Sequence, residues 1–373
     1  MTQRISGRVV TPDGVLDGGV VEVTGDRITA VRPTGSPGGP WVVPGFVDIH
    51  CHGGGGHTLT TGDPGAARGA AAFHLRHGTT TLVASLVSSP LALMRSATAA
   101  FAPLVAEGVL AGLHYEGPYL SVARCGAQNP DHLRDPSPAE LRELIDLADG
   151  ALRMVTIAPE RTGALEAIAL LREAGVVAAV GHTDADHAQT RAAVDAGATV
   201  ATHLFNGMPP IHHRQPGPVL ALLGAPEVVC EVVADGVHLH DGTLAYVAGS
   251  AGAQRTALVT DAMAAAGMPD GPYELGGLAV VVADGVARLA HNGAIAGSTL
   301  TMDAALRRAV GAGVPIDAAC RMAATTPAGA LGLADEVGSL APGRRADLVV
   351  LDDALRVTRV MRAGTWQDPP AGP

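Results

Sequence analysis

Two patterns of apolar and polar positions divide the chain. In residues 1–44, apolar and polar side chains alternate in short runs such as ISGRVV and RITAVRP, a period that is typical of strands. The same pattern returns near the other end, in GSLAPGRRADLVVLDD and RVTRVMRAG. We therefore expect one small β-sandwich domain built from both ends of the chain, residues 1–44 together with residues 335–373.

The middle of the chain, residues 45–334, alternates apolar runs with helical patterns such as TGALEAIALLREAG. This alternation favours a parallel sheet, and eight strand–helix units close a (β/α)₈ barrel, a TIM-like α/β fold. Residues 273–292 indicate a β insertion after the last strand, and helices are expected at about 300–312 and 315–330. The eight expected strands are 46–50, 79–85, 110–116, 153–158, 177–182, 199–204, 228–234 and 257–261.

Most of the expected strands end in residues that can bind a metal. Six ends read VDIHCHG, LHYEGP, AAVGHT, VATHLFN, VVADGVH and ALVTDAM, and barrel enzymes carry their chemistry at this end of the strands. His50 and His52 are two positions apart, so on a strand both imidazoles point to one face while Cys51 points away. Alone, this HxH would be read as polar residues entering a glycine-rich loop. At the end of the first barrel strand it indicates two metal ligands.

The other strand ends offer a carboxylate, two more imidazoles and a base. Glu116 ends the third strand, and His182 and His203 follow the fifth and sixth. Taken singly, they would be a turn carboxylate and two structural histidines; together on one rim they form a ligand set that suits a first-row metal. Asp261 follows the eighth strand. Its simpler interpretation is a helix N-cap, but beside a metal it is a candidate general base.

Composition excludes several kinds of chemistry. All 25 cationic side chains are arginines, so neither a carbamylated lysine that bridges two metals nor a Schiff-base lysine can form. A net charge of −11 argues against nucleic acid as a partner. The sequence has no apolar run of about 20 residues, which argues against a membrane span. The four cysteines form no CxxC, and the start lacks a signal-peptide core, so a cytoplasmic setting is expected.

These motifs give the chain a resemblance to a known enzyme family. The runs PGFVDIHCHG, HYEGPYLSVARCGAQNP, GHTDA, THLFNGMPP, ADGVH, VTDAM and AGSTLTM are similar to those of the N-acetylglucosamine-6-phosphate deacetylases, members of the amidohydrolase superfamily. The match runs from about residue 44 to residue 353. It implies a hydrolase of amino-sugar metabolism that converts N-acetylglucosamine 6-phosphate to glucosamine 6-phosphate and acetate.

The resemblance also implies roles for individual residues. Glu116, His182 and His203 would bind the main divalent metal, with Asp261 as the catalytic base. Some members of the family lack the first-strand HxH and use one metal; this chain has the pair, so one or two ions of zinc, iron, manganese or cobalt are expected. Contacts with the substrate would come from Ala127, Gln128, Asn206, Gly207, Arg214, His238, Ile295, Ala296 and Gly297.

In the family, the equivalent of Arg214 reaches the phosphate held by the neighbouring subunit, so a homodimer is expected. Two alternatives stay open at this point. The first is a deacetylase of another N-acetyl amino sugar, either unphosphorylated or epimeric, which would use the same barrel and metal ligands. The second is a barrel without catalytic activity that serves as a scaffold, although such a protein should have lost some of the ligands.

Overall fold

The computed structural model describes residues 1–367, and the centre of the molecule is an eight-stranded parallel sheet that curls into a barrel. The strand order is β14-β13-β12-β11-β10-β9-β8-β5, so strands that follow one another in the barrel sequence also lie side by side. All eight predicted strands are present, which confirms the predicted fold class. They are β5 Phe46–Cys51, β8 Thr79–Val87, β9 Gly112–Glu116, β10 Leu152–Ile157, β11 Val177–Val180, β12 Ala198–Ala201, β13 Val229–Val233 and β14 Thr256–Val259.

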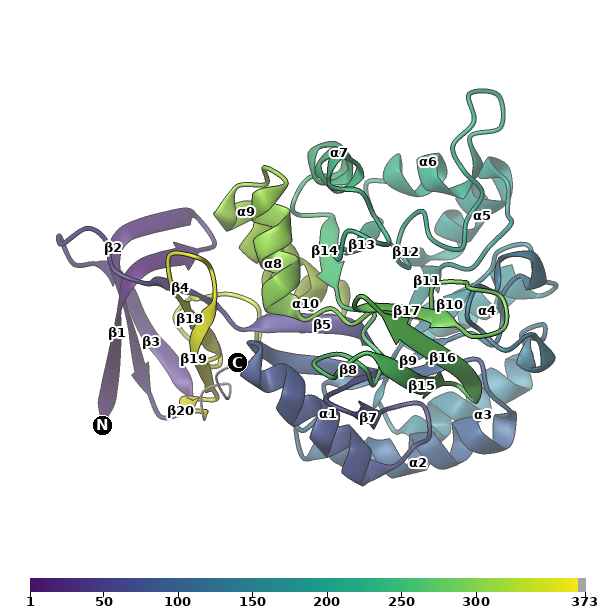
Figure 1. Ribbon diagram of the computed structural model, residues 1–373, viewed down its shortest axis with the longest axis horizontal. Coiled ribbons are helices and arrows are strands. Elements are labelled where there is room, and N and C mark those ends of the chain that lie inside the picture. Colours follow the sequence, from purple (N-terminus) through teal and green to yellow (C-terminus); the bar gives the residue numbers. More distant parts are fainter. Residues whose placement is uncertain (368–373) are drawn as a thin grey trace.

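Helices cover the outside of the barrel (Figure 1). Local signals start some of them: Asp186 and Gln189 form a reciprocal capping box at the start of α5, and the Ser137 side chain accepts from the backbone of Glu140 in α3. The helices are α1 Pro64–Arg76, α2 Leu91–Ala106, α3 Pro138–Ala148, α4 Ala164–Glu173, α5 His187–Ala196, α6 Gly217–Leu223, α7 Asp241–Ala251, α8 Met302–Gly311, α9 Ile316–Cys320 and α10 Thr326–Ala330, with a π-helical segment Arg321–Thr325 between the last two and 3₁₀ turns at Val122–Arg124 and Pro130–His132.

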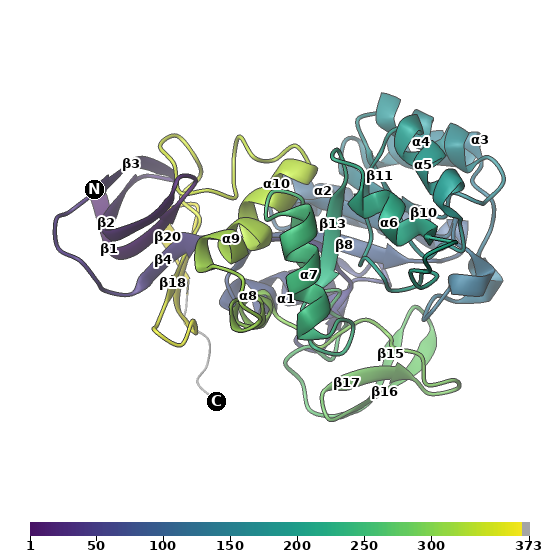
Figure 2. The ribbon, with the colours of Figure 1, turned by 90° about the horizontal axis from the view of Figure 1, so that it is seen from above.

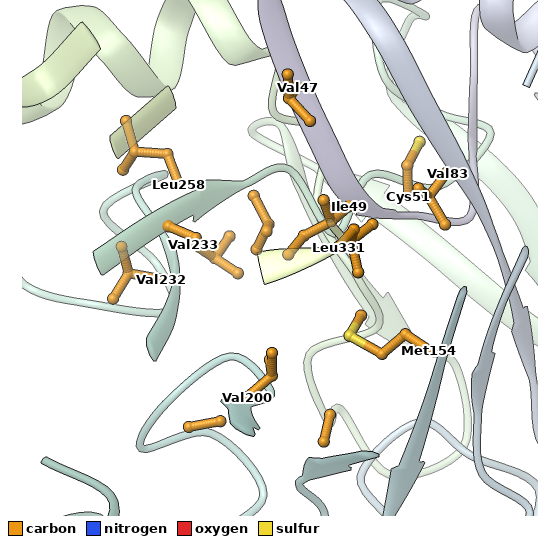
Figure 3. Packing of buried hydrophobic residues seen from close by; sticks show 14 of the residues in the cluster. Val47, Ile49, Cys51, Val83, Met154, Val200, Val232, Val233, Leu258 and Leu331 are labelled. Atoms are coloured by element: carbon orange, nitrogen blue, oxygen red, sulfur yellow. The ribbon is translucent and has the colours of Figure 1, made fainter. Parts of the chain in front are cut away.

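One large apolar core joins the barrel strands to the helical layer. Figure 3 shows part of it, with Val47, Ile49 and Cys51 following one another along β5 and Leu331 from the end of α10 in the same cluster. These side chains are fully or almost fully buried. The alternating positions of β5 are therefore free to carry polar groups toward the inside of the barrel.

Strands from both ends of the chain form a second, seven-stranded sheet in the order β20-β19-β18-β4-β1-β2-β3. Figure 1 shows it beside the barrel, at one end of the long axis. Val9 and Val23 from the beginning of the chain share an apolar core with Leu348 and Met361 from its end. The strands are β1 Thr2–Thr11, β2 Gly14–Thr24, β3 Arg27–Pro33, β4 Trp41–Pro44, β18 Leu348–Leu351, β19 Val357–Arg362 and β20 Thr365–Trp366.

The predicted division of the chain at residues 44 and 335 stays a prediction, and residues 368–373 of the predicted small domain lie outside the described residues. Among the helices of the described part, none is both long enough and apolar enough to cross a bilayer.

The predicted β insertion is present as a three-stranded antiparallel sheet, β15 Gly271–Leu275, β16 Leu278–Ala283 and β17 Val286–Leu289. It has an apolar core of its own, which includes Val280, Val282 and Leu289. Figure 2 shows this sheet as a separate layer along one side of the barrel. A two-stranded ribbon, β6 Gly53–Gly54 and β7 His57–Thr58, follows the first barrel strand.

Candidate metal centre

The alternation along β5 continues into the residue that follows it and separates His50 and His52 from Cys51, as predicted. Cys51 points outward to α1, where its Sγ lies 3.3 Å from Nε2 of His74. His50 and His52 point inward, and their Nε2 atoms are 3.2 Å apart. Both imidazoles are buried, with 0% and 1% of their side chains exposed.

Glu116, His182 and His203, here called the first triad, meet at the mouth of the barrel. Oε1 of Glu116 lies 3.0 Å from Nε2 of His182 and 3.0 Å from Nε2 of His203, and the two Nε2 atoms are 3.1 Å apart. Glu116 ends β9, whereas the two histidines lie just beyond β11 and β12. Three separate strand ends therefore place one oxygen and two nitrogens around a single point.

His50, His52 and Asp261, here called the second triad, lie next to the first. Oδ1 of Asp261 is 3.3 Å from Nε2 of His52 and 3.6 Å from Nε2 of His50. Glu116 lies between the two triads, because its Oε2 is 3.2 Å from Nε2 of His52 while its Oε1 faces the first triad. The two oxygens of this carboxylate therefore face different triads.

The opposite ring nitrogens of three of these histidines are held by acceptors, which leaves each Nε2 facing the centre. Nδ1 of His52 donates to the backbone oxygen of Ser85 at 3.1 Å, and Nδ1 of His182 donates to that of Arg124 at 2.8 Å. Nδ1 of His50 donates instead to a carboxylate, Oε2 of Glu231, at 3.0 Å. Such contacts fix the tautomer and orientation of a metal-binding imidazole.

Both carboxylates of the centre are ionised. Burial by itself raises the pKa of Glu116, but His50 and the hydrogen bonds from His182 and His203 outweigh it, so the pKa lies well below its ordinary value. Burial also opposes the charge on Asp261, yet His50 and His52 hold the pKa of this carboxyl below its usual range. Ionised carboxylates and inward-facing imidazole nitrogens are the form in which these side chains bind a cation.

The spacing of the donors fits a divalent metal. Ligand atoms at about 2.0–2.1 Å from a tetrahedral zinc ion are about 3.3 Å apart. The donors of the first triad are separated by 3.0–3.1 Å and those of the second by 3.2–3.6 Å. Each triad also brings two imidazole nitrogens face to face, an arrangement that a cation between them satisfies.

A model of the amidohydrolase family matches residues 41–367 of the chain. The chain belongs to the amidohydrolase family.

Solved structures of related proteins cover almost the whole of this amidohydrolase. It is 47% identical to the N-acetyl-D-glucosamine-6-phosphate deacetylase from Mycobacterium smegmatis, a mutant of which was solved in complex with N-acetyl-D-glucosamine-6-phosphate; the match covers 98% of this chain and 99% of that one with a TM-score of 0.95. The N-acetylglucosamine-6-phosphate deacetylase from Thermotoga maritima is 33% identical, and the match covers 98% of this chain and 99% of that one with a TM-score of 0.91.

Among curated relatives, the N-acetylgalactosamine-6-phosphate deacetylase of Escherichia coli O157:H7 is 37% identical over 366 residues, which is 96% of this chain and 97% of that protein. The N-acetylglucosamine-6-phosphate deacetylase of Vibrio furnissii is 36% identical over 330 residues, 87% of this chain and 81% of the relative.

A cavity of the amidohydrolase opens onto both triads. Leu275 and Ala294 from the region of the β insertion also line it. Two of the predicted substrate-binding residues lie elsewhere: Ala296 is buried in the core of the three-stranded sheet, and Arg214 lies in the exposed loop between β12 and α6. The predicted substrate-binding residues that do line the cavity are Ala127, Gln128, Asn206, Gly207, His238, Ile295 and Gly297.

His238 and Gln128 are fixed partly by predicted site residues and partly by Asp235 and Ser88, which sequence reasoning did not select. Nδ1 of His238 donates to Oδ2 of Asp235 at 2.7 Å, and its Nε2 lies 3.8 Å from Oδ2 of Asp261. Burial lowers the pKa of His238, but Asp235 and Asp261 outweigh it and raise the pKa above its ordinary value. Gln128 donates to Oε2 of Glu116 at 2.5 Å and accepts from the backbone N–H of Ser88 at 2.7 Å.

Two buried acids beneath the mouth were missed by the sequence analysis. Glu231 lies within β13, and its side chain is fully buried. Asp48 lies within β5, where burial raises the pKa of its carboxyl to about 6. The usable signal was an acid in the middle of an apolar strand, VVCEVV and GFVDIH, because burying such a group is costly unless it has partners. His114, a residue of β9, also lies beneath the mouth of the barrel, and its Nδ1 is 2.9 Å from Oγ of Ser85.

Proposed function

We propose that this amidohydrolase is a metal-dependent deacetylase that hydrolyses the acetamide of N-acetylglucosamine 6-phosphate, releasing acetate and glucosamine 6-phosphate. The observation that carries the proposal is the convergence of the two triads in a cavity, in a chain 47% identical to the M. smegmatis deacetylase solved with this sugar phosphate. The E. coli relative is named for the galactosamine epimer, so N-acetylgalactosamine 6-phosphate is the second candidate substrate.

The metal ligands in this proposal are Glu116, His182 and His203 for the main ion and His50 and His52 for a second. A divalent metal held there would supply Lewis acidity to a water molecule and to the acetyl carbonyl oxygen. The imidazole and carboxylate donors suit zinc, iron, manganese or cobalt.

Asp261 serves as the general base and then as the general acid. Its ionised carboxylate lies just beyond the end of β14, on the wall of the cavity. From there it can take a proton from the attacking water and return it to the leaving amine. Asp261 has φ of 49°, which turns its side chain out of the strand pattern and toward the histidines.

The phosphate contacts come from His238 and Arg214 in this proposal. His238, held by Asp235, presents its Nε2 edge to the cavity, and its raised pKa favours the cationic form. Arg214 is exposed and is not part of the cavity wall, and among the described residues that line the cavity there is no arginine. An arginine from a second subunit would supply the missing charge, which supports a homodimer.

A cytoplasmic location is proposed as well, supported by the four cysteines, which are all free thiols in the described part of the chain.

Acetate release tests the function directly. The metal-loaded protein should hydrolyse N-acetylglucosamine 6-phosphate and leave N-acetylglucosamine untouched, and Asp261→Asn should lower kcat by about 10²- to 10⁴-fold. Faster turnover of the galactosamine epimer would favour the second candidate. Turnover of only the free sugar would contradict the phosphate contacts, and no release from any of these sugars would contradict the proposed substrate class.

Complementation between inactive subunits tests the role of Arg214. Arg214→Ala and Asp261→Asn should each be nearly inactive alone. After the two are mixed and allowed to exchange subunits, a mixed dimer has one site with both residues intact, so about a quarter of the wild-type activity should return. No recovery in a mixture that demonstrably contains mixed dimers would contradict an Arg214 that acts across subunits.

A further inference from the structure

Glu231 is the buried acid that reaches both triads. Its Oε2 accepts from Nδ1 of His50 at 3.0 Å and from the backbone N–H of His203 at 3.1 Å. The backbone oxygen of Glu231 also accepts from the N–H of Leu204 at 2.9 Å. A single carboxylate oxygen is thus shared by a ligand of the first triad and a ligand of the second.

The contact with His203 anchors the carboxylate. His203 has φ of 26°, an uncommon conformation that needs support from its surroundings. Glu231 supplies that support with its side chain and, through Leu204, with its backbone. The anchored carboxylate then reaches across the inside of the barrel from β13 to the imidazole of His50 on β5.

Among the ligand histidines, His50 alone has a carboxylate as the acceptor of its Nδ1–H within the described structure. The corresponding acceptors for His52 and His182 are backbone carbonyls. A carboxylate behind an imidazole fixes its orientation and also makes the opposite nitrogen a stronger ligand. His50 therefore receives the strongest such support in the centre.

We propose that Glu231 is the positioning residue that creates the second metal position. It does so by holding Nε2 of His50 toward His52 and Asp261, at a fixed distance from the first triad. This inference rests on the proposed metal centre and deepens it. Glu231 is not among the described residues that line the cavity, so it would not touch a substrate bound there.

Metal binding, measured without substrate, tests this role. Titration of chelator-treated protein with Zn²⁺, followed by calorimetry and elemental analysis, should give two ions per wild-type chain and one in His52→Ala. Glu231→Leu should lower the affinity for the second ion by about 100-fold and the affinity for the first ion by a smaller factor. Loss of such a partner typically costs about 10- to 100-fold in metal affinity. Glu231→Gln should stay within about tenfold of the wild type, because its amide oxygen can still accept from His50.

A matched control removes a different carboxylate–histidine pair. Asp303 holds His77 with Oδ1 at 3.1 Å from Nδ1, in a place where α8 meets α1. Asp303→Asn should keep both ions with wild-type affinity. Any of three results would overturn the proposal. Glu231→Leu could bind both ions as tightly as the wild type, or lose as much or more affinity for the first ion as for the second, or the wild type could bind only one ion.

A second measurement covers the case in which Glu231→Leu does not fold. In Cd²⁺-loaded wild-type protein labelled with ¹⁵N-histidine, His50 should show cadmium coupling at Nε2 and a downfield Nδ1–H that moves upfield in Glu231→Gln. Ligation through Nδ1, or a proton resonance that does not respond to the substitution, would overturn the proposal. Both readouts are independent of acetate release, so an inactive protein would contradict the proposed substrate and leave the role of Glu231 standing.

Discussion

His182, His203 and Asp261 have φ values of 46°, 26° and 49°, in the left-handed region that non-glycine residues rarely adopt. Each follows the end of a barrel strand, so the unusual turn re-aims the side chain toward the centre. Such conformations cost about 1–3 kcal/mol each and persist only where the surroundings enforce them. Here the backbone N–H of Asp261 donates to the oxygen of His50 at 2.9 Å, and the oxygen of His182 accepts from Ser121 at 2.9 Å.

His74 should make the protein sensitive to acid. It is fully buried, and burial lowers the pKa of its imidazole from 6.5 to about 4. The unfolded chain therefore binds a proton that the folded chain excludes between these pH values. The stabilisation is complete above pH 6.5 and is lost as the pH falls toward 4, by about 3 kcal/mol in the free energy of unfolding.

Chemical denaturation of chelator-treated protein at a series of pH values measures this effect without interference from metal release. The reference is His74→Gln, which can still donate to the oxygen of Gly53 but does not titrate in this range. The stability difference between the two proteins should shrink on acidification. Parallel pH profiles would show that His74 does not carry the effect.

At the scale of single residues, the sequence predicted groups whose position in a strand defines their direction. His50 and His52 could be placed because alternation puts them on one face, and the structure brings them together. Glu231 could not be placed in this way, since its partner His50 lies on a strand far away in the sequence. The same holds for Asp235, whose contact with His238 depends on the geometry of a turn.

β5 and β14, the first and last strands of the barrel, meet in a seam with few backbone hydrogen bonds. The bonds described there join the N–H of His52 to Ala262 at 2.7 Å and the N–H of Asp261 to His50 at 2.9 Å. Deeper in the seam, the Asp48 carboxylate accepts from the hydroxyl of Thr260 at 2.5 Å. The second triad consists of residues from these two strand ends, so an ion bound there would link the two sides of the seam.

Loss of that link should loosen the seam more than the rest of the barrel. In metal-loaded His52→Ala, amide hydrogens of segments 46–52 and 256–262 should exchange at least about tenfold faster than in the wild type. Peptides from β10, which pairs with both β9 and β11, should be unchanged. Hydrogen exchange with mass spectrometry measures this, and equal acceleration in β10 would contradict a local effect.

At the scale of elements, the existence and order of the barrel strands were predictable because each is an apolar run followed by a helical pattern. The pairing of β4 with β18, which joins Trp41–Pro44 to Leu348–Leu351, was expected only in outline. Register between such distant segments is determined by packing, as for Val42 opposite Val350, and not by any local signal. The π-helical segment Arg321–Thr325 also has no local signal that sequence reasoning could use.

Segments from the two ends of the chain pack closely against each other, and substitution of Gly364 tests how tightly they pack. Gly364 has φ of 75°, and a Cβ there would lie 1.9 Å from the backbone oxygen of Gly25. Gly364→Ala should therefore lower the thermal unfolding midpoint by several degrees. The backbone of Gly364 is restrained, because its N–H donates to the oxygen of Ala346 at 3.0 Å.

Gly175→Ala is the matched control for this substitution. Gly175 has a similar φ of 71°, but a Cβ there would meet no heavy atom of the described residues within 4 Å. Its cost should be about 1–2 kcal/mol, from the backbone conformation alone. Equal losses in the two variants, measured by calorimetry, would show that the contact between Gly364 and Gly25 relaxes without strain.

The sheet that draws on both ends of the chain also bears on how the protein is made. During translation, β1 to β4 leave the ribosome before the barrel does, yet the core they share contains Leu348, Val350 and Met361, which are synthesised after the barrel. Until β18 is synthesised, β4 presents an open edge, which pairing with β18 then covers. A prematurely terminated chain would keep that edge exposed, which gives chaperones and proteases a means of recognising unfinished copies.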